Sequence, residues 1–186
     1  MIPIQTNGTR GLENIPGTTL PYTDANSRAF SYIRPLITAT GGLSLSQICT
    51  ITGLEGSTIQ NWVKRGWIGG SFKSKKYDER QVATILIFTA LRSCLQFESI
   101  AKLIAYVNAP DGGATNEGDL FSYMCEAVRE IGFNIDNTEP VLERVLNAYN
   151  GENRERLKKA LTVMVYACIC TDLSQAANLR LMQLIS

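Results

Sequence analysis

Two short runs of apolar residues at helical spacing, separated by a glycine turn, lie between residues 44 and 66. In the first run Ser44 can cap a short helix and Gly53 can end it. In the second run Ser57 supplies an N-cap, and three side chains turn inward at i, i+3 and i+4: Ile59, Trp62 and Val63. Two short helices joined by a turn, the second with a polar and basic face, are typical of a helix-turn-helix.

The outward face of this second helix carries the residue types that read DNA. Gln60 and Asn61 are the expected base readers, because their amides can pair with adenine edges. Lys64 and Arg65 are expected to contact phosphates, which positions a protein without reading sequence. Thr58 could contact either a phosphate or a base. The plainer interpretation is that these are ordinary exposed helix residues.

A segment rich in glycine and lysine follows, over residues 69–77. It predicts a short β-hairpin, or wing, with an aromatic residue at each end and three lysines between them that would contact phosphates: Lys73, Lys75 and Lys76. The lysines could instead simply keep the hairpin soluble. The aromatic residues of this region are expected to pack in the core and the wing rather than to stack on bases: Trp62, Trp67, Phe72 and Tyr77.

The charge of the chain is distributed unevenly along it. The formal net charge is only +1, so the total indicates no partner. Residues 40–77 carry five basic residues against Glu55 alone, whereas residues 109–186 carry seven basic and eleven acidic residues. A basic segment followed by an acidic one is typical of a module that binds a polyanion beside a module with another task. Chance clustering on a solvated face is the alternative.

The rest of the first half predicts three more helices. Residues 30–37 form a short amphipathic pattern that ends near Gly41-Gly42. Asp78-Glu79 opens a helix that carries apolar residues as far as Leu95, since acidic side chains favour a helix N-terminus. A further helix runs from Phe97 to Val107, and the loop around Pro110 is the strongest domain boundary in the chain.

The second half predicts only helices. Amphipathic patterns cover residues 120–131 and 141–149, and two further helices are expected over residues 152–171 and 174–185. The fold class is therefore all-α with a small β wing. The expected division is an irregular leader over residues 1–26, a winged helix-turn-helix over 27–108 and a helical C-terminal region over 109–186. That last region has apolar surface for self-association or for a small apolar effector, or it completes the core of a monomer.

The absence of histidine from the whole chain excludes several classes of enzyme. No Ser-His-Asp triad, Cys-His pair or His-ligated zinc site can be built. The five cysteines include no CxxC pair, and Cys168 and Cys170 lie in an apolar stretch. We expect these two to be buried packing residues, although a thiolate metal site remains an alternative. No catalytic residue, metal or cofactor is predicted; a carboxylate enzyme in the second half is the least favoured alternative.

The composition is that of an ordinary globular protein, with 45% hydrophobic and 19% charged residues. The first residues show no basic start followed by an apolar run, so no signal peptide is expected. The longest apolar run, residues 163–170, is far shorter than the roughly 20 residues of a membrane span. We therefore expect a cytoplasmic protein with no membrane contact.

The segment from Leu43 to Val107 resembles the winged helix-turn-helix of the mercury-resistance (MerR) regulators. The resemblance rests on a Thr52-Gly53 turn, a recognition helix over 57–66 that ends in Lys-Arg-Gly, a closing Tyr77 and an acidic start to the next helix. The whole chain is also similar to a bacterial family of unknown function in which this module precedes a helical C-terminal region. The first resemblance implies a recognition helix in the major groove and a wing on the phosphate backbone.

Three departures from the MerR pattern are visible. Gln60 stands where an arginine is usual, and Trp62 where a tyrosine is usual, which is closer to excisionase-type relatives. The helix that ends at Val107 does not continue into a long coiled coil, so the family's dimer geometry is not implied. The sequence predicts a DNA-binding transcription regulator that partners double-stranded DNA and forms a homodimer or binds an effector. The alternative is a protein-interaction adaptor that binds no DNA.

Overall fold

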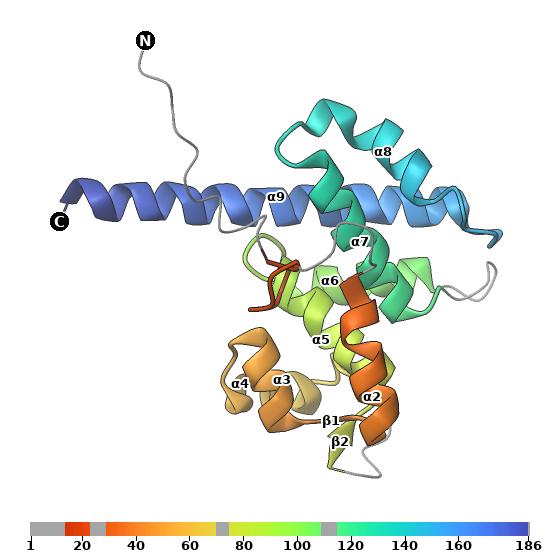
Figure 1. Cartoon of the computed structure of the whole chain (residues 1–186), viewed down its shortest axis with the longest axis vertical. Coiled ribbons are helices and arrows are strands. Elements are labelled where there is room, and N and C mark those ends of the chain that lie inside the picture. Colours follow the sequence, from red (N-terminus) through yellow and green to blue (C-terminus); the bar gives the residue numbers. More distant parts are fainter. Residues whose placement is uncertain (1–13, 23–28, 70–74, 109–114, 186) are drawn as a thin grey trace.

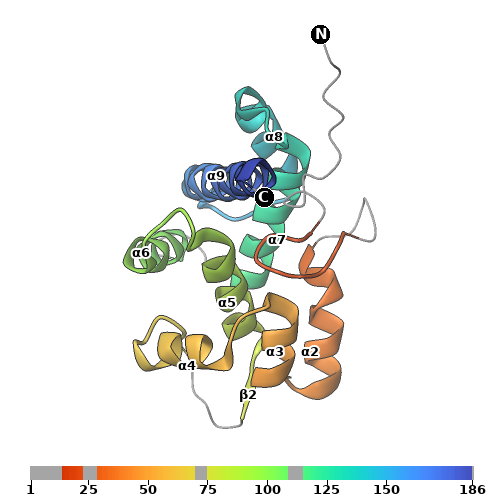
Figure 2. The ribbon, with the colours of Figure 1, turned by 90° about the vertical axis from the view of Figure 1, so that its left-hand side faces the viewer.

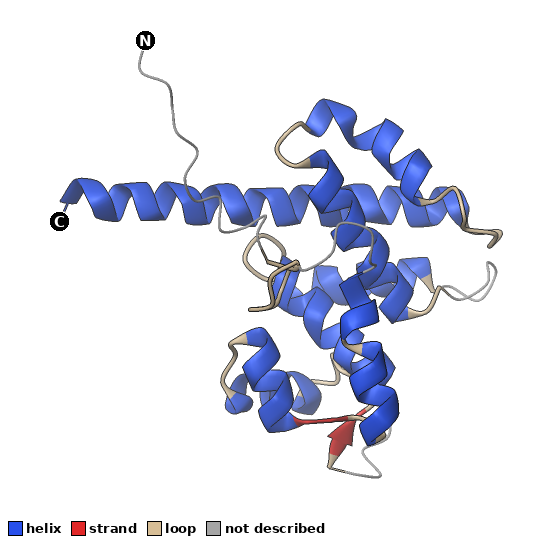
Figure 3. Cartoon of the chain, viewed as in Figure 1, coloured by secondary structure: helices blue, strands red, loops and turns tan. Residues whose placement is uncertain are grey.

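The structure is a computed structural model that describes residues 14–22, 29–69, 75–108 and 115–185. These residues form a mostly helical protein with one small two-stranded sheet, as the sequence predicts (Figure 3). In chain order the elements are η1 (Ala29–Tyr32), α2 (Arg34–Thr40), β1 (Leu43–Ser44), α3 (Leu45–Thr52), α4 (Gly56–Lys64), β2 (Lys76–Tyr77), α5 (Glu79–Leu91), α6 (Phe97–Val107), α7 (Glu117–Ile131), η2 (Ile135–Asn137), α8 (Thr138–Val145) and α9 (Arg154–Ile185).

Helix α3 begins and ends where the sequence predicts. Ser44 accepts a hydrogen bond from the backbone N–H of Gln47, and the Gln47 side chain accepts one from the Ser44 N–H, so the two form a capping box. Gly53 ends the helix with a φ of +69°, the left-handed region that glycine adopts without a steric penalty. The sharp turn between α3 and α4 depends on that conformation.

Helix α4 begins earlier than the sequence predicts. Its N-cap is Glu55, whose carbonyl oxygen accepts a hydrogen bond from Thr58 N at 3.0 Å. Ser57 was expected in that role, but it already lies in the first turn, because Gly56 adopts helical geometry. Glu55 makes no side-chain capping bond. Ser57 therefore lies on the exposed surface of α4 and not at its cap.

The described strand of the expected wing, β2, pairs with residues that precede α3. Strand β2 pairs antiparallel with β1, with Leu43 opposite Tyr77 and Ser44 opposite Lys76. Gly42 permits this pairing, because a Cβ added there would lie 2.8 Å from the Tyr77 carbonyl oxygen. The sheet therefore joins the residues before α3 to those before α5. Residues 70–74, which would complete a hairpin, lie outside the described part of the chain.

Helix α5 occupies the centre of the molecule and is buried on nearly every side (Figure 2). Asp78 caps it through a capping box with Gln81, and it ends at Leu91, short of the expected Leu95. It packs against α3, α6, α7 and α9. A helix enclosed in this way carries apolar residues all round instead of on one face.

Buried side chains from both predicted segments form one hydrophobic cluster. Trp62 and Phe88 from the first half belong to the same cluster as Phe121, Met124 and Leu161 from the second. The largest contact between helices joins α5 to α7, across the expected boundary near residue 109. The division of the chain into a module over residues 27–108 and a helical region over residues 109–186 stays a prediction.

The end of the expected leader packs on this core. Ile15 is buried, and Thr19 N donates to the carbonyl of Ile51 at 2.8 Å. Tyr22 donates its hydroxyl to the Cys125 carbonyl at 3.1 Å. Residues 14–22 are irregular, with an isolated bridge between Asn14 and Pro21, and they tie the turn after α3 to α7.

Helix α9 is one helix of 32 residues where the sequence predicts two (Figure 1). No proline or glycine interrupts residues 154–185, so Ser174 is accommodated within the helix and does not begin a new one. The first half of α9 packs on α6, α7 and α8, whereas its last turns extend beyond the other described elements. By length and composition α9 could cross a membrane, and 39% of its most apolar 18-residue window is buried within the fold.

The two neighbouring cysteines of α9 differ in their surroundings. Cys168 is buried, as expected, and its Sγ lies 3.9 Å from Sδ of Met124. Cys170 is exposed, contrary to the expectation that both are buried, because two residues along a helix rotate a side chain by about 200°. Burial raises the pKa of the Cys168 thiol well above its usual value, which disfavours a metal-binding thiolate.

Candidate nucleic-acid interface

Helix α4 is anchored to the core by two side chains, Ile59 and Trp62. Both are at least 97% buried, and the Trp62 ring lies 5.9 Å from Phe88 of α5 and 5.3 Å from Phe97 of α6, centroid to centroid. Val63 is partly buried beside them. The inward face is thus the one that the sequence predicts, and it fixes which side of α4 meets the solvent.

The exposed face of α4 presents a polar and basic surface. Gln60, Asn61 and Lys64 are exposed, and they lie on the same side of the helix as Ser57, because they follow it at three, four and seven residues. Thr58 is half-buried on the flank of that face. The structure therefore brings together Gln60, Asn61 and Lys64, adds Ser57, and sets Thr58 to one side. The spacing of Ser57, Gln60 and Asn61 at i, i+3 and i+4 indicates that Ser57 shares this face. The prediction from the sequence missed it because Ser57 was expected to be the N-cap.

Arg65 follows the last turn of α4 and rests on an aromatic ring. Its guanidinium carbon lies 5.1 Å from the centre of the Trp67 ring. Trp67 in turn stacks on Phe97, with centroids 4.5 Å apart and planes 2° from parallel. A cation over an aromatic face is held in place, so Arg65 is positioned at the C-terminal end of α4. Trp62 and Tyr77 are buried, as expected for packing aromatics, whereas Phe72 lies outside the described residues.

The described lysines of the expected wing lie at the sheet. Lys75 and Lys76 are both exposed, and Lys76 Nζ donates to the carbonyl oxygen of Thr40. Lys73 lies outside the described part of the chain. Helices α3 and α4 and the two-stranded sheet occupy the same end of the molecule, away from α9 (Figures 1 and 2). Four of the five residues predicted to contact phosphates therefore lie at one end of the molecule.

Arg34 neutralises acidic groups near this end. Arg34 Nη2 lies 2.8 Å from a Glu79 carboxylate oxygen and 3.2 Å from one of Asp119. Partial desolvation lowers the pKa of the Arg34 guanidinium, but the hydrogen bonds that it donates to these two carboxylates outweigh this effect and raise the pKa above its usual value. The pairs join α2, α5 and α7.

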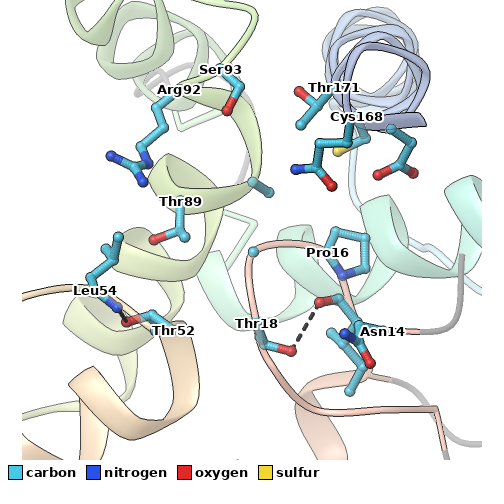
Figure 4. A pocket seen from close by; sticks show the side chains of 16 residues that line it. Asn14, Pro16, Thr18, Thr52, Leu54, Thr89, Arg92, Ser93, Cys168 and Thr171 are labelled. Carbon is cyan, nitrogen blue, oxygen red and sulfur yellow. Dashed lines mark hydrogen bonds between the residues drawn. The ribbon is translucent and has the colours of Figure 1, made fainter. Parts of the chain in front are cut away.

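A pocket of about 270 Å³ lies between the N-terminal segment, the turn after α3, α5 and α9 (Figure 4). Most of its lining is polar, including Thr18, Thr89, Arg92 and Gln175. Asp172 also lines it, and burial raises the pKa of that carboxyl to about 6. This polar lining does not suit a small apolar effector.

A second pocket of about 170 Å³ lies beside α5 and α6 and has aromatic walls from Trp67 and Phe88. Its polar side is formed by Glu117, which is 6% exposed and accepts a hydrogen bond from Arg80 Nε at 2.7 Å. Asn108 donates to the same carboxylate at 3.2 Å. Both partners keep the buried Glu117 charge compensated. Among the residues that the structure describes, no three His, Cys, Asp or Glu side chains form a cluster that could hold a metal ion.

Comparison with known proteins matches this end of the molecule and much of the core to one family. Residues 42–124 match the family model described as a domain of unknown function, DUF1836. An uncharacterised protein, YkrK, of Bacillus subtilis (strain 168) is 37% identical over 65 residues, which are 33% of this chain and 28% of the relative. The chain therefore aligns with about a quarter of that relative's length. No solved structure matches the chain.

Proposed function

We propose that this protein is a DNA-binding transcription regulator of MerR-like type, with a winged helix-turn-helix that reads DNA and a helical C-terminal region. The observation that carries the proposal is the exposed face of α4. It presents two amides and a lysine, it is held rigidly by Ile59 and Trp62, and exposed lysines lie at the same end of the molecule.

In this proposal α4 enters the major groove. Gln60 and Asn61 would pair with adenine edges, and Thr58 on the flank would contact a base or a phosphate. The phosphate contacts would come from the basic residues at the C-terminal end of α4 and in the expected wing: Lys64, Arg65, Lys73, Lys75 and Lys76. The proposal includes a cytoplasmic location and no enzymatic activity.

The main alternative is an adaptor in which the winged-helix fold binds protein and no DNA. This alternative is supported by two basic side chains that already have partners within the chain: Arg65 lies over the Trp67 ring, and Lys76 donates a hydrogen bond to Thr40. A DNA reader needs these cations to reach phosphates. The two functions therefore differ in how strongly salt affects binding.

Salt-dependent binding to duplex DNA separates the two proposals. Fluorescence anisotropy with random-sequence duplex DNA would be measured over a salt series, with the wild type and a variant carrying Ala at Lys64, Arg65, Lys73, Lys75 and Lys76. If all five contact phosphates, log K falls with log salt at a slope of about −4 to −5 per module, and the variant loses the binding.

A matched control removes basic residues elsewhere on the surface: Arg92, Lys102, Lys159 and Arg180, each changed to Ala. This control should keep the slope of the wild type. A slope near zero in the wild type would contradict DNA binding. Capture of a protein partner that is insensitive to Lys64→Ala and Arg65→Ala would favour the adaptor.

A further inference from the structure

Large apolar side chains remain exposed along α9. Several are about half exposed or more, and Leu184 reaches 83%. Most lie beyond Asp172, where α9 extends past the other described elements (Figure 1). The exposed members are Val163, Tyr166, Leu173, Leu179, Leu181, Met182, Leu184 and Ile185. Contiguous apolar surface of this kind marks an interaction site.

One group of these side chains forms a continuous line along the helix. Positions 163, 166, 170, 173, 177, 181 and 184 follow one another at three or four residues, which places them on one side of α9. We call this line the α9 stripe; it comprises Val163, Tyr166, Cys170, Leu173, Ala177, Leu181 and Leu184. Every member is exposed. Steps of three and four are the spacing of a coiled-coil seam, and the two successive steps of four from 173 to 181 interrupt the strict alternation once.

We propose that the α9 stripe binds the α9 stripe of a second copy of this chain in an antiparallel pair. With the two-fold axis near Gln175, Leu173 packs against Ala177 of the partner subunit, and Leu184 packs against Tyr166 of the partner subunit. Near the axis a large side chain then meets a small one, and further out the Leu184 and Tyr166 side chains pack against each other. This inference rests on α9 alone and does not depend on DNA binding.

The antiparallel direction follows from two residues at or beside the seam. In a parallel pair Arg180 would face its own copy, which places like charges together, and Ala177 would face Ala177 and leave a gap. In the antiparallel pair Arg180 lies opposite Cys170 of the partner subunit. The two arginines are then about ten residues apart along the axis, or roughly 15 Å.

The area of the stripe is sufficient for a specific dimer. At about half exposure a large apolar side chain leaves on the order of 100 Å² uncovered. The five large members of the stripe therefore offer on the order of 500 Å² per copy, or about 1,000 Å² for the pair, which is the lower limit of a specific interface.

A lipid surface fits α9 less well than a second copy does. Helices that lie on membranes carry lysines and arginines along the polar face, whereas residues 163–185 contain one basic residue, Arg180. A membrane-spanning α9 would have to withdraw Leu157, Leu161 and Met164 from the core, where all three are fully buried.

Sedimentation equilibrium of the full chain tests the dimer with two matched double variants. Leu173→Glu with Leu184→Glu places two carboxylates in the stripe and should raise the dissociation constant by roughly 100-fold or more. Leu179→Glu with Met182→Glu makes the same chemical change on the opposite side of α9 and should leave the constant within about threefold of the wild type. Circular dichroism checks that both variants keep their helices.

The direction of pairing is tested by cross-linking. In a background of Cys94→Ser and Cys170→Ala, Ser174→Cys lies beside its own copy across the two-fold axis, whereas Gln175→Cys points away from the partner. A short bifunctional thiol reagent should link two chains through position 174 and not through position 175. A monomeric wild type at 100 µM, equal loss in both double variants, or co-flotation of the wild type with phosphatidylcholine–phosphatidylglycerol vesicles would each overturn the proposal.

Discussion

Trp62 is the residue on which the placement of α4 most depends. It is 3% exposed and contacts aromatic rings from both α5 and α6. Its neighbours Asn61 and Lys64 point to solvent from the same helix. The residues proposed to touch DNA are therefore oriented by one that cannot touch it.

Replacement of Trp62 by Ala should lower the free energy of unfolding by about 3–5 kcal/mol, because it removes a buried aromatic ring and leaves a cavity. Lys64→Ala, two residues further along on the exposed face, should change it by less than about 0.5 kcal/mol. Urea denaturation followed by circular dichroism measures both. Similar values for the two variants would contradict the orientation of α4.

Asp172 should make stability depend on pH. Burial raises the pKa of its carboxyl from 3.8 to about 6 in the folded state, so the folded protein holds the proton more tightly than the unfolded chain. The resulting stabilisation is complete below pH 3.8 and is lost as the pH rises through 6. Above that pH the partly buried carboxylate destabilises the folded state, and Asp172→Asn removes this destabilisation.

The expected gain from Asp172→Asn is about 1 kcal/mol at pH 8, after allowance for the solvent that reaches this half-buried group. The gain should shrink between pH 6 and pH 4 and be absent below pH 4. Urea titrations of both proteins at pH 8 and pH 4 make the comparison. A gain of the same size at both values would exclude the carboxyl as its source.

Helix ends differ in how firmly they are capped. Asp78 accepts a hydrogen bond from Gln81 N at 2.8 Å at the start of α5, whereas Glu55 makes no side-chain capping bond at the start of α4. Asp78→Ala should therefore cost about 1 kcal/mol of unfolding free energy, and Glu55→Ala only a few tenths. Thermal unfolding of the two variants provides the measurement; equal losses would show that capping is not the cause.

Local patterns in the sequence predicted most helices well. Ser44 and Gly53 bound α3, Asp78 caps α5, and α6 covers Phe97 to Val107 as expected. Two of the wrong predictions arose either from contacts between distant parts of the chain or from a residue that is compatible with more than one structure. Strand β2 pairs with Leu43–Ser44, more than thirty residues earlier, which no local pattern indicates. Ser174 was interpreted as the start of a helix, although serine is also tolerated within one.

The candidate site was predictable where it depends on helical spacing. Exposure of Gln60, Asn61 and Lys64 follows from the inward positions of Ile59 and Trp62. The contact of Arg65 with Trp67 and that of Lys76 with Thr40 arise from the tertiary fold. Spacing along the chain cannot reveal them, because each partner is positioned by another element.

The whole molecule should unfold in one step. Trp62 and Trp67 lie in the first half of the chain, whereas Leu161 of α9 is fully buried in the same cluster from the second half. Leu161→Ala should cost about 2–5 kcal/mol, and tryptophan fluorescence should report the same shift as far-ultraviolet circular dichroism. A fluorescence midpoint unchanged by Leu161→Ala would mean that residues 27–108 fold by themselves.

Because α9 is unbroken, the directions in which the side chains of its first half point determine those of its second half. Its first half is held by the core through Leu157 and Leu161, and its last turns carry the exposed side chains at 100° of rotation per residue. One residue inserted after Thr171 would turn every later side chain to a new direction. Seven inserted residues would restore the direction and move the tip about 10 Å further from the core. Length and direction can therefore be altered separately along this one helix.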